Sequence, residues 1–202
     1  MTDRILHRSG AILILLTVLL SGGSFGHARE AENHVSFCGG MFYQAGWSRL
    51  ETPYGEVSGF SSGLGGKLGF YLSPGFRLGA MGFSAGLRYD KDVHAPSSYT
   101  SAGAGGLTAE KIWRLGAWRI GTGIMLGGGH FEHLHILSVE GGMNTVGYDD
   151  YRSFLASPLL SVEYPLSDKI TAMCMADWLF GNAVIAGRQF GPSLRLGILF
   201  TH

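Results

Sequence analysis

Large apolar side chains alternate with small or polar ones in eight segments of the chain, each about ten residues long. The clearest run lies at 118–127, where one class is formed by Trp118, Ile120, Thr122, Ile124 and Leu126, and the other by Arg119, Gly121, Gly123, Met125 and Gly127. A period of two places successive side chains on opposite faces of a strand. The same pattern predicts strands at 40–48, 63–72, 81–90, 106–113, 153–164, 170–180 and 190–200.

The two classes of side chain also indicate what each face of the sheet contacts. The class rich in Gly, Ser and charge cannot form a packed core. A soluble β-sandwich or lipocalin-like barrel would bury the apolar class inside and expose the polar one. Here the large apolar class must face an apolar surrounding, and lipid is the candidate.

Short and long connections alternate between the predicted strands. The short turns lie at 73–75, 114–116 and 165–168, and the long loops at 49–61, 91–101, 132–152 and 181–189. This is the connectivity of outer-membrane barrels, in which the long loops face outward. We therefore predict an all-β fold, an eight-stranded antiparallel transmembrane β-barrel spanning 40–202.

The N-terminal segment has the pattern of a secretory signal. Arg4 and Arg8 precede an apolar run at 11–20, and the small-residue stretch after it ends at Ala28. The run is shorter than the roughly 20 residues of a membrane-spanning helix. We expect a cleavable signal peptide at 1–28 and a short periplasmic segment at 29–39. An uncleaved anchor is the alternative.

Composition removes several classes of function. Lys and Arg together number 15, as do Asp and Glu, so no basic surface for nucleic acid is expected. Charged residues make up 15% of the chain, against roughly 25% in soluble domains. Its two cysteines, Cys38 and Cys174, are too few for a disulfide scaffold, and their predicted positions do not bring them together.

The closing stretch 191–200 resembles the C-terminal assembly signal of outer-membrane proteins, with Thr201 and His202 following its terminal Phe200. The mature chain resembles the eight-stranded OmpA/OmpX/OmpW group, most closely OmpW over 148–178. The resemblance implies a multi-pass protein of the bacterial outer membrane, with outer-membrane lipid and the barrel-assembly machinery as partners. It also implies passage of small hydrophobic solutes. We expect a monomer.

Folding the strands brings charges of both signs into the lumen. The expected set is Lys67, Arg88, Asp90, Glu110, Arg119, Glu163, Asp177 and Arg195. Mutual pairing is expected because an unpaired buried charge is costly. Across the turn at 114–116, Glu110 and Arg119 should lie opposite each other. The set is interpreted as a structural plug, with a gate or narrow polar pore as the alternative.

An apolar group also points inward in this alternation. Its members are Phe42, Met125, Leu155, Leu159, Met173, Met175 and Leu179. They either fill space in a narrow lumen or, as the resemblance to OmpW implies, line a passage for hydrophobic molecules.

Four residues near the third long loop could suggest a metal site: His130, Glu132, His133 and His135. Alternation places His130 on the opposite face from His133 and His135, so we predict no metal and no cofactor. Lipid A deacylases share this barrel and use a His-x-Ser motif. No such motif lies on a predicted strand: the two matches, His7-Arg8-Ser9 and His34-Val35-Ser36, fall in the expected signal peptide and in the segment before the first predicted strand, so no enzyme is expected.

Two functional classes remain open from the sequence. One is a narrow passive channel for small, hydrophobic solutes. The other is a structural or adhesin-like surface protein that acts through its long loops.

Overall fold

The computed structural model describes residues 36–52, 55–89, 98–138, 144–181 and 191–201. The expected signal peptide lies outside these residues. The described part of the predicted periplasmic segment already belongs to the first strand, which begins at Ser36 rather than at 40. No helix in the described residues is long and apolar enough to cross a membrane.

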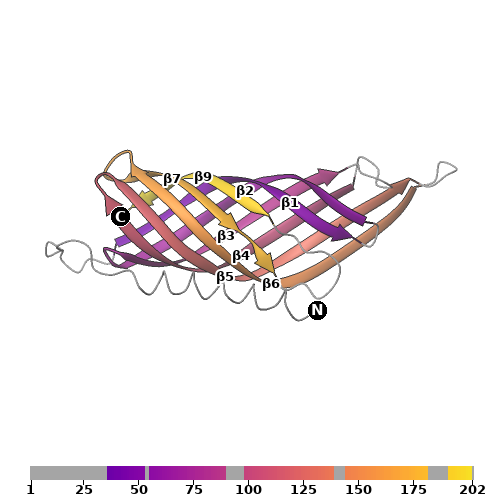
Figure 1. Cartoon of the computed structure of the whole chain (residues 1–202), viewed down its shortest axis with the longest axis horizontal. Coiled ribbons are helices and arrows are strands. Elements are labelled where there is room, and N and C mark those ends of the chain that lie inside the picture. The colour runs from indigo at the N-terminus through magenta and orange to yellow at the C-terminus, as the bar shows by residue number, and fades with distance from the viewer. Residues whose placement is uncertain (1–35, 53–54, 90–97, 139–143, 182–190, 202) are drawn as a thin grey trace, which may run out of the picture. The chain divides into compact units, whose positions relative to one another are not determined.

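Nine strand segments close into a ring of eight antiparallel strands (Figure 1). They are β1 (Ser36–Thr52), β2 (Gly55–Ser73), β3 (Phe76–Tyr89), β4 (Ser98–Leu115), β5 (Trp118–Ser138), β6 (Asn144–Pro165), β7 (Ile170–Trp178), β8 (Phe180–Gly181) and β9 (Pro192–Thr201). β7 and β8 are one strand interrupted at Leu179. Pairing of β1 with β9 and of β5 with β6 closes the ring, which confirms the predicted barrel.

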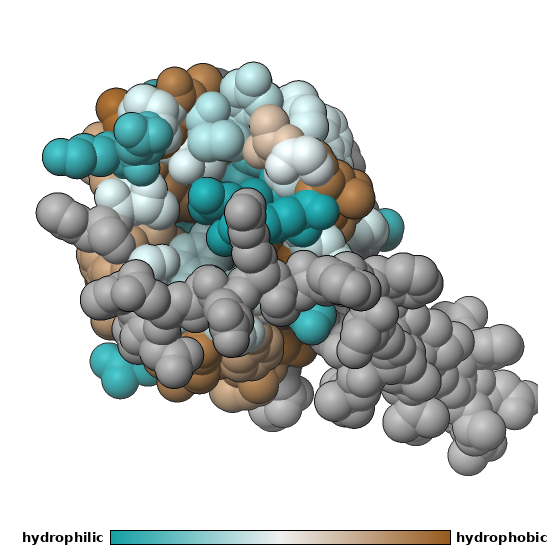
Figure 2. All heavy atoms as spheres, turned by 90° about the vertical axis from the view of Figure 1, so that its left-hand side faces the viewer, coloured by the Kyte–Doolittle hydropathy of each residue, from teal (hydrophilic) through white to brown (hydrophobic). Residues whose placement is uncertain are grey.

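The large apolar class faces outward, as predicted, on every strand except β3. The exposed apolar side chains include Met41, Tyr43, Leu64, Leu68, Leu107, Leu126, Leu160, Leu194, Leu196 and Ile198. Seen from the end with the short turns, hydrophilic residues gather in the middle of the barrel and hydrophobic ones lie along much of its rim (Figure 2). This arrangement suits a protein surrounded by lipid.

The predicted facing of β3 is wrong. Met81, Leu87 and Tyr89 are buried in the lumen, whereas Arg88 is exposed on the outer face. In most strands the inward class is small or polar, but here the lumen takes large apolar side chains and the outer face carries Gly82, Ser84 and Gly86. The polarity of the strand therefore runs opposite to that of its neighbours.

The strands on the long-loop side are longer than predicted. Residues 49–61 were expected to form a loop, but β1 and β2 remain paired out to Thr52 and Gly55. Likewise β5 and β6 remain paired out to Ser138 and Asn144, within the predicted loop 132–152. The β5–β6 hairpin projects at the right of Figure 1.

The turn between β4 and β5 sets the register of both strands. Leu115 pairs with Trp118, so the turn consists of Gly116 and Ala117. Gly116 has a φ of 61°, a conformation that a residue without a Cβ adopts at no steric cost. The turn centre thus lies after Gly116 rather than at Leu115, which moves the cross-strand partner of Glu110 to Gly123.

Candidate functional site

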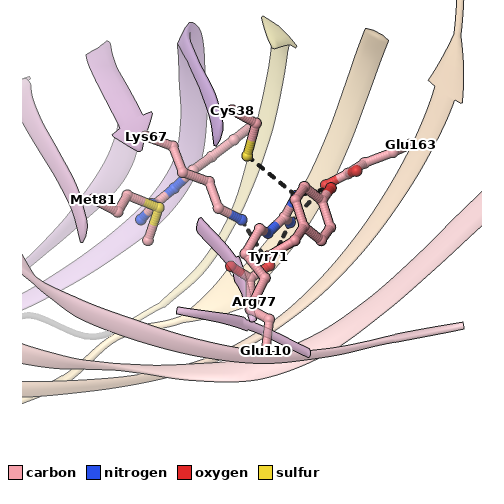
Figure 3. A network of polar contacts seen from close by, with 8 residues as sticks. Cys38, Lys67, Tyr71, Arg77, Met81, Glu110 and Glu163 are labelled. Atoms are coloured by element: carbon pink, nitrogen blue, oxygen red, sulfur yellow. Dashed lines mark hydrogen bonds and ion pairs between the residues drawn. The ribbon is translucent and has the colours of Figure 1, made fainter. Parts of the chain in front are cut away.

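A buried network of charges fills the lumen near the short-turn end (Figure 3). Arg77 on β3 lies between two carboxylates: its Nη2 is 2.8 Å from Glu110 Oε2 and 2.6 Å from Glu163 Oε1. Lys67 Nζ on β2 is 2.7 Å from the same oxygen of Glu110. These four side chains are almost completely buried, and their two positive and two negative charges balance.

Tyr71 and Cys38 complete this network. Arg77 Nη1 donates a hydrogen bond of 2.9 Å to the Tyr71 hydroxyl and lies 3.8 Å from Cys38 Sγ. Cys38 is buried inside while Cys174 is on the outward-facing class of β7, and both are free thiols, as predicted. The network ties β1, β2, β3, β4 and β6 together across the lumen.

A second ion pair lies further along the lumen. Arg195 Nη2 on β9 is 2.7 Å from Asp177 Oδ2 on β7. Ser157 and Ser193 donate hydrogen bonds to the same carboxylate. The guanidinium of Arg195 also lies 4.4 Å from the ring centre of Phe83. Because its charge is paired and its plane is covered by an aromatic ring, this arginine is held in place from several sides.

Not all the predicted lumen charges meet. Lys67, Glu110, Glu163, Asp177 and Arg195 are inside and paired, as expected. Arg88 points outward, and Asp90 lies outside the described residues. The predicted Glu110–Arg119 pair is wrong: with the turn at Gly116, Arg119 lies opposite Arg114 and Glu163 instead.

Sequence reasoning missed Arg77, the centre of the first network. The signal was present in the neighbouring hairpin. Phe70 on β2 faces outward and pairs with Leu78 across the short turn, whereas Tyr71 pairs with Arg77. Cross-strand partners lie on the same face of a sheet. The known orientation of β2 would therefore have placed Leu78 on the outer face and Arg77 in the lumen.

The predicted apolar group lies inside but forms two clusters. Phe42, Met125, Leu159, Met173 and Met175 pack together, joined by Met81 and Leu199. Leu155 belongs to a second cluster with Ala102 and Phe131, and the half-buried Leu179 packs against both.

The inward face of β6 shows how these groups follow one another along the lumen. In order from the short-turn end it carries Glu163, Ser161, Leu159, Ser157, Leu155, Ser153, Tyr151 and Asp149. A hollow beside Arg195, lined also by Gln44 and Phe83, has a volume of about 50 Å³. That is room for a few water molecules at most. Charged and apolar side chains thus fill successive levels of the lumen.

The histidines lie where alternation placed them, near the outer mouth. His133 and His135 are buried inside with ring centres 6.0 Å apart, while His130 is on the outer face, 3.3 Å from Glu132. His135 lies 3.5 Å from an Asp149 oxygen through Nε2 and 3.1 Å from the Tyr89 hydroxyl through Nδ1. Among the described residues, no group of three or more potential ligands is arranged to hold a metal ion.

His133 should make the stability of the mouth depend on pH. Burial, reinforced by the charge of His135, lowers the pKa of His133 to about 4. The unfolded chain binds this proton near pH 6.5. The contribution of the neutral His133 side chain to the free energy of unfolding is therefore fully present above about pH 6.5. It is lost as the pH falls toward 4.

We expect the wild type to lose on the order of 1–3 kcal/mol more than His133→Gln between pH 7 and pH 4. Urea unfolding in lipid vesicles at both pH values measures the difference. An identical pH dependence in the two proteins would show that His133 is not buried in its neutral form.

Comparisons with known proteins identify the fold rather than a family. No protein-family model matches the chain, and no curated protein matches its sequence. Among solved structures, the Neisserial surface protein A (NspA) aligns with a TM-score of 0.56 at 15% identity, covering 83% of this chain and 99% of that one.

Two further solved structures align over most of their length. The outer membrane protein OprG from Pseudomonas aeruginosa has a TM-score of 0.54 at 8% identity, covering 84% of this chain and 97% of that one. The attachment invasion locus protein Ail of Yersinia pestis has a TM-score of 0.50 at 11% identity, covering 82% and 98%. Together with the closed ring of strands and its apolar exterior, these likenesses show that the chain has the fold of the small outer-membrane β-barrels.

Proposed function

We propose that this protein is a sealed barrel of the bacterial outer membrane that acts as a surface-interaction protein through its projecting β5–β6 hairpin. The observation that carries the proposal is the filling of the lumen. Its buried charges are paired with one another, and apolar clusters occupy the levels between them. An eight-stranded barrel has an interior just wide enough for side chains to fill.

The β5–β6 hairpin offers the surface for such an interaction. Its strands have 21 and 22 residues, about twice what is needed to cross a bilayer. On the outer face of its far end, Val146 is 61% and Tyr148 56% exposed. Tyr148 pairs with Leu134 of β5, which pairs in turn with the exposed Tyr99 of β4. Exposed apolar side chains grouped beyond the lipid-facing band are typical of a contact surface for another molecule.

Labelling of intact cells tests the location and orientation of the hairpin. We expect Tyr148→Cys to react with a membrane-impermeant maleimide on whole cells, because this exposed position lies on the long-loop side. The wild-type protein should show little labelling, because Cys38 is buried and Cys174 lies on the lipid-facing side.

Ser167→Cys is the matched control, because Ser167 is exposed at the short-turn end. It should react only after the cells are broken open. Labelling of Tyr148→Cys that also requires broken cells would contradict the proposed orientation.

A further inference from the structure

A hollow opens at the short-turn end of the barrel, the end that faces the viewer in Figure 2. Its volume is about 460 Å³, which lies within the range of small-molecule sites. Pro165 and Leu166, where β6 ends and its turn begins, give the hollow an apolar wall. The polar residues that line it are Arg119 on β5, Ser167 and Asp168 in the turn, Thr171 on β7 and Thr201 on β9. An arginine and several hydroxyl residues thus line the same space.

Two arginines lie side by side at this end of the barrel. Arg114 on β4 and Arg119 on β5 are cross-strand partners beside the turn at Gly116. Like charges directly opposite each other destabilise a pair of strands. The ion pairs among the described residues include neither arginine. Arg114 is exposed, but Arg119 is half-buried, so its charge is partly removed from water without gaining a carboxylate partner.

The carboxylates near these arginines do not offset their charge. Glu163 on β6 is the cross-strand partner of Arg119, but it binds Arg77 at 2.6 Å. The buried network around Arg77 is neutral as a whole, because it contains two positive and two negative side chains. In the turn between β6 and β7, the charges of Asp168 and Lys169 cancel each other. Two positive charges therefore remain at this end of the lumen.

Thr171 adds a buried hydroxyl group to the lining of the hollow. It is only 2% exposed, and its hydroxyl has no hydrogen-bond partner among the described residues. A buried hydroxyl without a partner costs free energy. A water molecule would satisfy this hydroxyl but would not neutralise the two arginines. Thr171 and Arg119 together therefore indicate a negatively charged ligand with several hydrogen-bond acceptors.

We propose that this hollow binds a phosphate monoester. Guanidinium groups pair with phosphate through two parallel hydrogen bonds. A dianion with three free oxygens can bridge Arg114 and Arg119 and also accept a hydrogen bond from Thr171. A carboxylate has one charge and two oxygens, so it would match a single guanidinium. The hollow leaves room for an organic group, which would lie against Pro165 and Leu166.

Nuclear magnetic resonance of the full chain, folded in neutral detergent micelles, tests the proposal. The signals of the arginine Nε–H groups are followed in phosphate-free buffer at constant ionic strength, and the signal missing from Arg119→Gln identifies Arg119. We expect glycerol 3-phosphate to shift this signal saturably and sodium acetate to leave it in place. A shift that does not saturate, or an equal response to acetate, would overturn the proposal. The site is independent of the partner of the β5–β6 hairpin, and this measurement does not depend on the orientation of the barrel in the membrane.

A soluble phosphate ester and a lipid headgroup offer the same chemistry, so a second titration distinguishes these two sources. Dioleoyl phosphatidic acid carries a phosphate monoester on a lipid and is added to the same micelles. Binding about tenfold tighter than that of glycerol 3-phosphate would assign the site to a lipid headgroup. Equal or weaker binding would assign it to a soluble phosphate ester. Absence of saturable binding by both probes would overturn the proposal.

Variants test the role of each group, with binding followed through the remaining signals. Arg114→Gln and Arg119→Gln should each weaken glycerol 3-phosphate binding about tenfold or more, and Thr171→Val about threefold. Arg114→Gln should also raise the urea midpoint without ligand, because it removes a like-charge pair, so its weaker binding would not reflect unfolding. Lys111→Gln is the matched control: it removes a positive charge from the same strand, outside the lining of the hollow, and should weaken binding less than about twofold. An equal loss in Lys111→Gln and Arg119→Gln would overturn the proposal.

Discussion

Replacing Glu110 with Gln is expected to lower the free energy of unfolding by about 3–5 kcal/mol. Glu110 holds both Lys67 and Arg77, at 2.7 and 2.8 Å, in a completely buried position. Without its charge, two buried cations share the single carboxylate of Glu163. Urea unfolding in lipid vesicles measures the effect.

The double variant Lys67→Met with Glu110→Gln distinguishes the network from a general packing defect. It leaves Arg77 paired with Glu163, so the charges balance again. We expect it to recover a large part of the stability lost in Glu110→Gln. Asp150→Asn, at an exposed carboxylate, is the control and should change stability by less than about 1 kcal/mol. Strictly additive effects of the two substitutions would contradict a coupled network.

Replacing Leu196 with Arg should destabilise the folded protein in vesicles by about 2–4 kcal/mol. Leu196 is 55% exposed on β9, midway between Pro192 and Phe200, so it faces the middle of the apolar band. A guanidinium placed there loses its hydration to hydrocarbon.

Leu196→Met keeps the side chain apolar and should cost little. The two variants should also differ less in detergent micelles than in vesicles, because water reaches a micelle surface more easily. Equal stability of Leu196→Arg and Leu196→Met in vesicles would contradict burial of this face in lipid.

The barrel itself could be predicted because lipid imposes the same outward polarity on most strands. In β5, for example, Ile120 and Leu126 face outward while Gly123 and Met125 face inward, as their alternation indicates. The prediction failed in β3, where the lumen takes Met81 and Leu87 and the outer face takes glycines. When both faces of a strand carry apolar or small side chains, their polarity does not show which face points to the lipid. Only the pairing of that strand with its hydrogen-bonded neighbours shows it.

The candidate site was predicted in part for a related reason. The inward placement of the five paired lumen charges follows from strand parity alone. Which charges pair with one another depends on the register of the strands, and the turn sets that register. Because the centre of the β4–β5 turn lies at the bond after Gly116, Glu110 and Arg119 are not cross-strand partners. Arg77 was missed because it stands next to a turn, outside the segment in which alternation was counted. The extended hairpins were missed because glycines and charges in 49–61 and 132–152 suggested loops, whereas cross-strand pairing continues through them.

Planar-bilayer recording of the wild-type protein tests most directly the claim that the lumen is sealed by its own side chains. In the described residues, the paired charges around Arg77 and Arg195 and the apolar cluster around Met125 occupy successive levels of the lumen. We therefore expect no conductance above that of the bare bilayer, with a large porin inserted in parallel to show that the assay detects channels. Discrete, reproducible conductance steps from the wild type would contradict the account and favour the narrow channel.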